Sequence, residues 1–286
     1  MDTTYKLGAT PLDDPGLRWF LERDNPYQSI PAVRSAAISV PGRDGLIAQH
    51  NEHYQSGTLA LRLIVTDNDQ HGTTRGFGQL EDNLQYILGL AGRRTDLQTI
   101  HRVRGDKQHF TRARVVTSIQ PEFLDPRNVR VILVFELPDP LWREERWTTA
   151  TSPSLSSGET WSTSSPTLGG GNAPIRDAII YADGSMTQLR VTDQTSGQWI
   201  ELNATSGPGQ GLRIDVLDMR AIRYEGNPLD PDTSVDVTGN LDAGPGGFSL
   251  VPHYTHTQTQ SVVSMDVYRF GGTGTVKIRA RRAWLL

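Results

Sequence analysis

Short apolar segments separated by turn residues fill the second half of this chain, and this pattern constrains the fold most strongly. The segments lie at 178–181, 188–191, 198–202, 212–216, 221–224, 248–250 and 276–280. Gly, Ser, Thr and Asp gather between them, for example at 182–185 and 271–274. Several short strands at such spacing are typical of an antiparallel sandwich. The second half is therefore predicted to be a β-sandwich without a helix.

The first half combines strands with one amphipathic helix. Apolar residues at every second position of 58–65 predict a half-buried strand, which we expect to pair with the segment that ends at Pro41. After a polar loop, apolar residues recur at helical spacing from Phe77 to Ala91 and predict a helix of about four turns. Further strands are expected at 97–104, 110–119 and 128–137. The predicted fold class is mainly β with one amphipathic helix.

The chain is long enough, at 286 residues, for two domains with separate cores. Two prolines interrupt the segment 137–142, and a run rich in Ser, Thr and Gly follows at 148–171. Such a run rarely builds a core, although Leu155 and Trp161 within it also fit a first strand of the next domain. We expect two domains, at 1–146 and 147–286.

Composition excludes some classes of function. The chain has no cysteine, so a disulfide framework, a thiolate zinc site and a cysteine nucleophile are excluded. A formal net charge of -4 does not indicate nucleic-acid binding. The N-terminus lacks the pattern of a secretory signal, and no run approaches the ~20 apolar residues of a membrane span. We expect a protein that folds in a cytoplasm, without a membrane partner.

The segment from Pro41 to Gly45 is a tight double turn. Pro followed by Gly suits a type II turn, and Asp followed by Gly is a hairpin pair. A strand is expected to enter, reverse and leave here, with no catalytic group attached. The turn contains Gly42, Arg43, Asp44 and Gly45, and by itself it indicates only a reversal of the chain.

Basic residues concentrate in a predicted hairpin of the first domain. They are Arg93, Arg94, Arg102, Arg104, Lys107, Arg112 and Arg114. Because Phe110 is the only aromatic residue among them, an exposed hairpin face is favoured over a nucleic-acid site, and a charged protein interface also fits. The interface candidates in this hairpin are Arg102, Arg104, Lys107 and Arg112.

Motifs for catalysis, cofactors and metals are lacking. No nucleophile elbow, phosphate loop or dinucleotide fingerprint is present, so no catalytic residue and no cofactor is assigned. The histidine pairs at 50–53 and 253–256 lack a third ligand at a recognised spacing, and the acidic loop at 230–236 departs from the EF-hand pattern. An irregular calcium site in that loop is left open, and no metal ligand is assigned.

Two alternative functions remain open at this level. A carbohydrate-binding, lectin-like module would use Trp161, Tyr181 and Trp199 as stacking platforms, although aromatic residues on a sandwich are more often part of its core. A polysaccharide hydrolase would need a pair of carboxylates that the sequence does not identify. Neither alternative is supported by a specific motif.

Several motifs, taken in order, resemble the distal tail proteins (Dit family) of long-tailed bacteriophages. They are the turn at Pro41 to Gly45, Asp139-Pro140-Leu141-Trp142, Gly171-Asn172-Ala173-Pro174, Trp199-Ile200-Glu201-Leu202, Leu212-Arg213-Ile214-Asp215 and the closing Arg282-Ala283-Trp284-Leu285. Each motif is weak, but their order spans nearly the whole chain. The polar segment 255–260 departs from the aromatic, Asn-rich approach that the family often shows before its closing strand.

The resemblance implies a structural protein of the virion rather than an enzyme. It implies a split β-barrel-like ring domain followed by a galectin-like sandwich, and a homo-oligomeric ring, typically of six copies, in the tail tip or baseplate. The implied partners are the tail tube protein, a tail-tip or tail-associated protein, and receptor-binding or side-fibre proteins. Assembly would take place in the host cytoplasm, with the basic hairpin making contacts between subunits. The resemblance also implies that the turn shapes or supports such an interface, which makes Gly42, Arg43, Asp44 and Gly45 interface candidates.

Overall fold

The computed structural model describes residues 3–22, 32–34, 38–39, 46–47, 53–92, 96–226, 234–254 and 259–285. The chain divides into two compact units. Unit 1 comprises Met1–Arg143 with Leu285–Leu286, and unit 2 comprises Glu144–Trp284.

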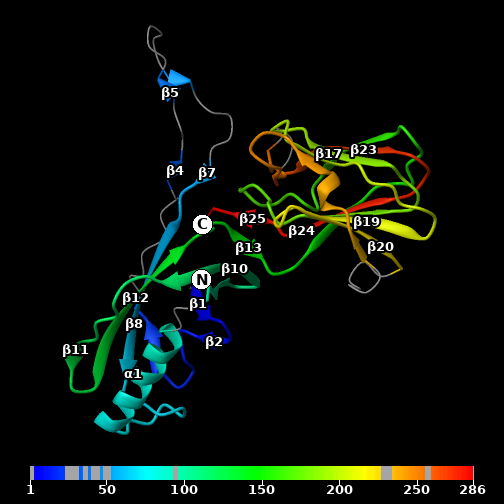
Figure 1. Cartoon of the computed structure of the whole chain (residues 1–286). Coiled ribbons are helices and arrows are strands. Elements are labelled where there is room, and N and C mark those ends of the chain that lie inside the picture. Colours follow the sequence, from blue (N-terminus) through cyan, green and yellow to red (C-terminus); the bar gives the residue numbers. More distant parts are fainter. Residues whose placement is uncertain are drawn as a thin grey trace. The chain divides into compact units, whose positions relative to one another are not determined.

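Unit 1 is built around one antiparallel sheet, which curls into a half-barrel (Figure 1). Its strands lie in the order β2-β1-β9-β10-β12-β8-β3, with β11 paired to β12 and β13 paired to β10. Their bounds are β1 Thr4–Leu7, β2 Thr10–Pro11, β3 Trp19–Leu21, β8 Gly57–Thr66, β9 Gln98–Arg104, β10 Lys107–Val115, β11 Glu122–Asp125, β12 Asn128–Leu137 and β13 Trp142–Glu144. The sheet joins segments that are far apart in the sequence.

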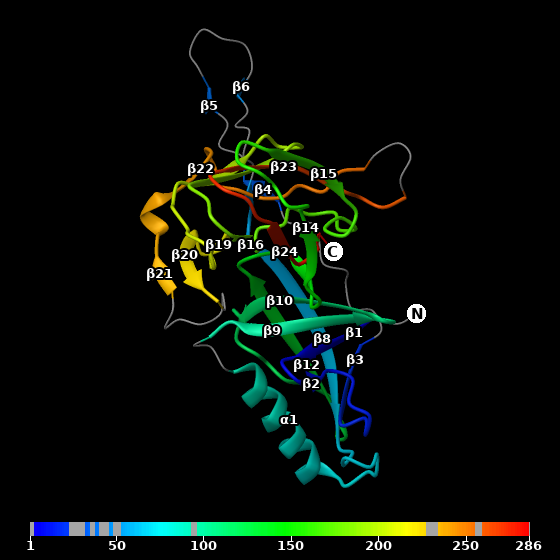
Figure 2. The ribbon, with the colours of Figure 1, turned by 90° about the vertical axis from the view of Figure 1, so that its right-hand side faces the viewer.

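The core of unit 1 lies between this sheet and helix α1 (Phe77–Ala91). Every second residue of β8 from Leu59 to Val65, and of β12 from Val129 to Leu137, is buried, as a strand with one covered face requires. Helix α1 packs beside β8 and β12 and buries Leu80, Ile87 and Ala91 (Figure 2). The predicted amphipathic helix and half-buried strand are thus confirmed.

The partners of β8 differ from the expected ones. This strand pairs with β12 over its whole length, from Gly57 to Thr66, and with β3 on its other side. The segment before Pro41 instead contains β4 (Val33–Arg34) and β5 (Ile38–Ser39), which pair with β7 (His53–Tyr54) and β6 (Leu46–Ile47). The prediction that the strand at 58–65 pairs with the segment ending at Pro41 is therefore wrong, because the extended apolar strand 128–137 offers it a fully matched partner.

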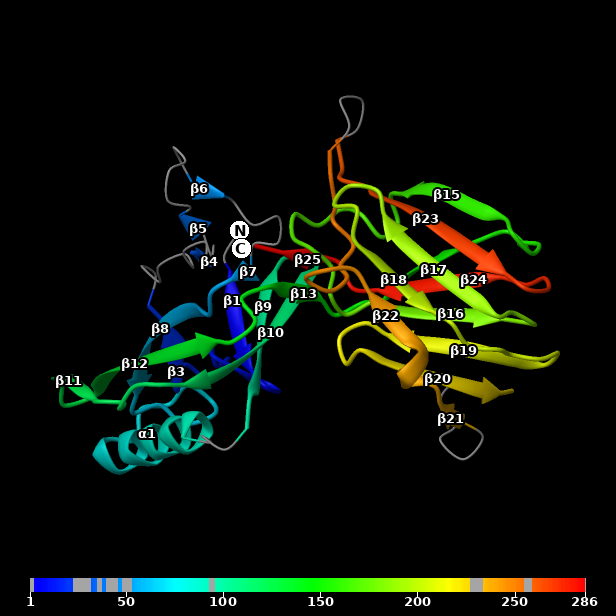
Figure 3. The same ribbon diagram turned by 45° about the horizontal axis from the view of Figure 1, so that its top comes forward.

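Unit 2 contains two antiparallel sheets (Figure 3). The first has the order β14-β24-β16-β19-β20-β21, and the second has the order β15-β23-β17-β18-β22. Bounds in the first sheet are β14 Thr148–Thr151, β16 Ile179–Asp183, β19 Gln210–Asp215, β20 Arg220–Glu225, β21 Ser234–Asp236 and β24 Val276–Ala280. Bounds in the second are β15 Thr160–Ser165, β17 Gln188–Asp193, β18 Trp199–Leu202, β22 Leu241–Ala243 and β23 Val263–Phe270. Strand β25 (Ala283–Trp284) and the 3-10 turn η1 (Thr238–Asn240) complete the described elements.

Alternating burial in both sheets creates one apolar core in unit 2. Ile180, Leu212 and Ile278 are buried from the first sheet, while Leu189, Ile200 and Val267 are buried from the second. The antiparallel β architecture predicted from the turn spacing is confirmed. Within the described part of unit 2, η1 is the only helical element.

Two details of unit 2 depart from the sequence-based expectations. The segment 248–250 forms only an isolated bridge, between Leu250 and Ile175, rather than a strand. Strand β23, which was not expected, lies inside the second sheet and pairs with both β15 and β17. The Ser- and Thr-rich run after the boundary contributes β14 and β15, so part of it is strand rather than free linker.

Candidate functional site

The predicted basic hairpin exists and consists of β9 and β10, joined at Gly105 and Asp106. Lys107 lies opposite Arg104, and His109 lies opposite Arg102. Directly opposed residues point to the same face of a sheet, and successive residues point to opposite faces. Arg102, Arg104 and Lys107 therefore share one face of the hairpin. We call these three residues the basic tip.

The basic tip adjoins the apolar side of unit 1. Strand β1 places Tyr5 opposite Arg102 and Leu7 opposite Ile100, and the Tyr5 ring meets Trp142 edge-on with 6.4 Å between centroids. Burial, together with the charges of Arg102 and Lys107, lowers the pKa of His109 to about 4. This histidine is therefore neutral at pH 7, and the cationic charge here belongs to the tip residues alone.

Arg112 lies on the other face of the same hairpin. It is opposite Thr99, on the side that also carries His101 and Phe110, whose rings are 6.3 Å apart. Of the four interface candidates in this hairpin, the structure thus brings together Arg102, Arg104 and Lys107 and separates Arg112 from them.

The other interface candidates, Gly42, Arg43, Asp44 and Gly45, lie outside the described residues. The flanking pairs are described. Ile38 lies opposite Ile47 and Ser39 opposite Leu46, in antiparallel register, which agrees with the expected reversal of the chain. Strands β4 to β7 form two small two-stranded sheets, and neither sheet pairs with another strand of the described chain.

The three candidate carbohydrate contacts do not form one platform. Trp161 lies opposite the buried Val267 and so points to the core side of its sheet. Trp199 alternates with the buried Ile200, so it lies on the opposite side of that sheet. Tyr181 belongs to the other sheet, where it alternates with buried Ile180.

The indole of Trp199 is already covered. The Arg190 guanidinium lies over its ring, 4.5 Å from the centroid. A Cβ added at Gly244 would lie 3.1 Å from the indole nitrogen, so the backbone of that loop approaches the same side chain closely. The ring contacts its own fold rather than presenting an open stacking surface.

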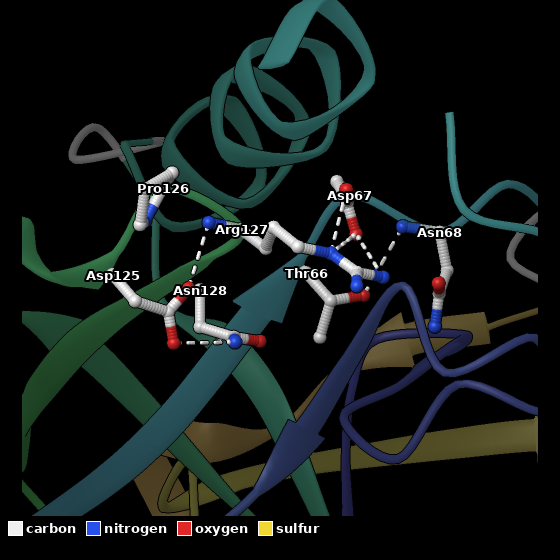
Figure 4. Close-up of a pocket in the computed structure, with 7 residues that line it drawn as sticks. All are labelled: Thr66, Asp67, Asn68, Asp125, Pro126, Arg127 and Asn128. Atoms are coloured by element: carbon white, nitrogen blue, oxygen red, sulfur yellow. Dashed lines mark hydrogen bonds and ion pairs between the residues drawn. The ribbon is translucent and has the colours of Figure 1, made fainter. Parts of the chain in front are cut away.

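A polar pocket lies where β8 and β12 meet the loop before α1 (Figure 4). The carboxylate of Asp67, which is buried, accepts hydrogen bonds from the Arg127 guanidinium at 3.2–3.4 Å. Arg127 also donates to Thr74 at 2.6 Å, and Asn128 donates to Asp125 at 2.8 Å. The charged groups of this pocket bond to one another and so join the turn between β11 and β12 to the loop that follows β8.

A neighbouring amide fixes the same region to the helix. Asn83 on α1 is buried and donates from Nδ2 to the backbone oxygens of Thr66 and Asn68, each at 2.8 Å. The sequence gives one signal for this contact. Asn83 is a polar residue at a position where the helical spacing predicts the buried, apolar face. Asn83 joins α1 to the end of β8.

A buried arginine organises one end of unit 2. Arg269 on β23 is fully buried and donates to the backbone oxygens of Asp183 and Ser185, each at 2.9 Å. The Asp183 carboxylate accepts a hydrogen bond from Tyr224 at 2.7 Å and lies 3.2 Å from the Lys277 ammonium. The sequence carries one signal for this cluster, since Arg269 continues the alternation of Val263, Met265 and Val267.

Two further observations concern other kinds of site. No group of three or more His, Cys, Asp or Glu side chains in the described chain could hold a metal ion. Among the residues that the structure describes, no helix has the length and apolar character needed to cross a lipid bilayer.

Comparisons with known proteins find similarity in structure and none in sequence. No protein-family model matches the chain, and no curated protein sequence matches it. The crystal structure of the Dit protein of SPP1, described as a paradigm of the hub adsorption apparatus in phages that infect Gram-positive bacteria, aligns with a TM-score of 0.60. The alignment covers 98% of both chains at 14% identity.

Two structures of the phage p2 baseplate, in its activated conformation with Sr or Ca, align more loosely, with TM-scores of 0.39 and 0.41 at 9% identity. They cover 98% and 99% of this chain, and 98% of the baseplate chain in each case. The resemblance to distal tail proteins is thus confirmed at the level of the fold, since along nearly its whole length this chain has the fold of the SPP1 Dit protein.

Proposed function

We propose that this chain is a structural protein of a phage tail, a distal tail hub that forms a homo-oligomeric ring, typically of six copies. The observation that carries the proposal is the alignment with SPP1 Dit over 98% of both chains, which includes both compact units rather than one common β module. A sandwich alone would be compatible with many functions, because folds are shared by unrelated proteins. An alignment that covers both units is compatible with fewer functions than an alignment of the sandwich alone.

The surface of unit 1 also supports a role in assembly. The basic tip makes no ion pair within the described chain, and β4 to β7 form small sheets of two strands each. An isolated two-stranded sheet is marginally stable in water, so such strands benefit from another surface. Unit 1 would form the ring beneath the tail tube, with Gly42, Arg43, Asp44, Gly45 and the basic hairpin contributing to contacts between subunits.

Unit 2 would face outward in this arrangement. As a galectin-like sandwich, it would connect the ring to the tail-tip protein and to receptor-binding or side-fibre proteins. The role is non-enzymatic, it is carried out in the virion, and assembly would precede release from the host cytoplasm. The carbohydrate-binding alternative gains no support from the separation of Trp161, Tyr181 and Trp199.

Antibody labelling tests this proposal directly. Phage particles from a culture that produces the chain are labelled with a gold-conjugated antibody against it and imaged by negative-stain electron microscopy. We expect gold at the end of the tail that is distant from the capsid. Label on the capsid, or intact tailed particles that carry none, would contradict the assignment. Denatured particles probed by immunoblot serve as the control for epitope access.

A further inference from the structure

The three basic side chains of the tip make no ion pair within the described chain. Arg104 and Lys107 are exposed, whereas Arg102 is half-buried and its Nε lacks a hydrogen-bond partner. Some other arginines of unit 1 are paired, as Arg18 is with Asp14 at 2.7 Å and Arg114 with Glu136 at 2.7 Å. The lack of an ion pair therefore distinguishes the tip from these paired arginines of the same unit.

Helix α1 carries the complementary charge. Its sequence from Phe77 to Ala91 contains Glu81 and Asp82 and no basic residue. Both acids are exposed, and neither makes an ion pair or a side-chain hydrogen bond within the described chain. The helix thus presents two adjacent, uncompensated carboxylates to its surroundings.

Exposed aromatic side chains flank these two acids. Phe77 lies four residues before Glu81 and is 54% exposed, and Tyr86 lies four residues after Asp82 and is 50% exposed. Side chains four residues apart are neighbours on a helix surface. Phe77 stacks on Phe123 of β11, itself 57% exposed, with 6.4 Å between ring centroids. Aromatic residues are enriched at protein interfaces, so this surface can contribute apolar contacts to a partner in addition to charge.

The tip and the helix face belong to different parts of unit 1. The tip lies at the far end of β9, beside β1, whereas α1 packs over β8 and β12 and leads back to the start of β9 (Figure 2). Seven residues of extended β9 separate its start from the tip, which is about 20 Å at the usual rise per residue. Pairing between the two surfaces is therefore a contact between copies.

We propose that the basic tip of one copy docks on the Glu81–Asp82 face of α1 in the next copy. Because two different patches of the same chain meet, the contact is head-to-tail, and repetition around a closed rotation produces a ring. Each exposed ion pair contributes little on its own, so the apolar contact around Phe77 and Phe123 supplies affinity while the charges set register and direction. This inference rests on the proposed hub function and names the surfaces that build its ring.

Charge reversal with rescue tests the pairing in the full-length chain. One variant combines Arg104→Glu with Lys107→Glu, a second combines Glu81→Lys with Asp82→Lys, and a third carries all four changes. The matched control combines Asp218→Lys with Asp242→Lys, which alters net charge as the helix variant does but on exposed residues of unit 2. Assembly is measured by sedimentation velocity over a concentration series, and circular dichroism melting verifies folding.

We expect each two-site variant to weaken association at least tenfold, and the four-site variant to return to within about threefold of the wild type. The control should assemble as the wild type does. Wild-type rings with undiminished assembly in the reversal variants would overturn the docking inference while leaving the hub function in place. Weakened association in both variants without recovery in the four-site variant would likewise overturn the pairing. A wild type that never assembles would contradict the hub function itself.

Discussion

Two arginines of unit 2 are bonded within their own fold, whereas the arginines of the basic tip in unit 1 make no ion pair within the described chain. Arg269 is buried and bonds to two backbone oxygens, and Arg190 lies 3.6 Å from the Glu201 carboxylate while covering Trp199. Arg102, Arg104 and Lys107 share a face and make no ion pair in the part of the chain that the structure describes. Arginine therefore stabilises the fold of unit 2 at position 269, whereas in unit 1 the basic residues of the tip are proposed to contact a second copy. The two regions should respond differently to mutation.

The largest loss of stability is expected for Arg269→Met. The substitution keeps the apolar stem and removes the donor that the carbonyl oxygens of Asp183 and Ser185 share, which should lower the free energy of unfolding by about 3 kcal/mol. Chemical denaturation monitored by Trp fluorescence measures this loss. A change below about 0.5 kcal/mol, the range of neutral surface substitutions, would show that the buried guanidinium is not a stabilising element.

A smaller loss is expected for Asn83→Ala in unit 1. The change removes the amide that donates to the Thr66 and Asn68 oxygens and should cost about 2 kcal/mol. Gln85→Ala, at an exposed position of the same helix, is the matched control and should be nearly neutral. Hydrogen exchange at the end of β8 should increase in the Asn83 variant alone, and equal protection in both variants would contradict the role of this contact.

The neutral His109 of unit 1 predicts an effect of pH on stability. Its folded pKa of about 4 lies below the ordinary value of 6.5, so the unfolded chain takes up a proton first as the pH falls. The stability contributed by His109 is complete above pH 6.5 and is lost as the pH falls toward 4. We expect the Tm to fall less between pH 7 and pH 4.5 in His109→Gln than in the wild type. Parallel Tm profiles of the two proteins would contradict this assignment.

The smallest effect on folding is expected for Arg112→Ser. This exposed residue makes no ion pair within the described chain, so its replacement should change the free energy of unfolding by less than about 0.5 kcal/mol. Arg114→Ser, which breaks the pair with Glu136, provides the comparison on the same strand. A loss above 1 kcal/mol for Arg112→Ser, measured by urea denaturation, would show that the hairpin arginines support the monomer fold after all.

Periodicity in the sequence was enough to predict the local elements. The helix was expected from Phe77 to Ala91 and the strand from 128 to 137, and the structure has both with these bounds. The central strand β23 carried the same alternating signal at Val263, Met265 and Val267, yet it was not among the expected strands. Periodicity does not predict which strands pair. The partners of β8 are β12 and β3, and this pairing depends on how strands far apart in the sequence pack into one core.

The faces of the basic hairpin depended on register, which the sequence did not supply. The second strand was expected to begin at Phe110, whereas β10 begins at Lys107, which lies opposite Arg104. Only this register places Arg102 opposite His109 and separates Arg112 from the basic tip. A shift by one residue would move every side chain to the other face. Likewise, the sequence contains the acids of α1, but only the structure shows that neither makes an ion pair within the described chain.

The oligomeric state of the purified wild-type chain tests the central claim most directly. Sedimentation equilibrium at increasing protein concentration measures the mass of the assembled species against the 31.6 kDa of one chain. The proposed hub predicts a closed species that grows no further, with a mass about six times that of the chain, and a ring in negative-stain images of the same sample. A strictly monomeric chain at every concentration, with no ring in the images, would contradict it.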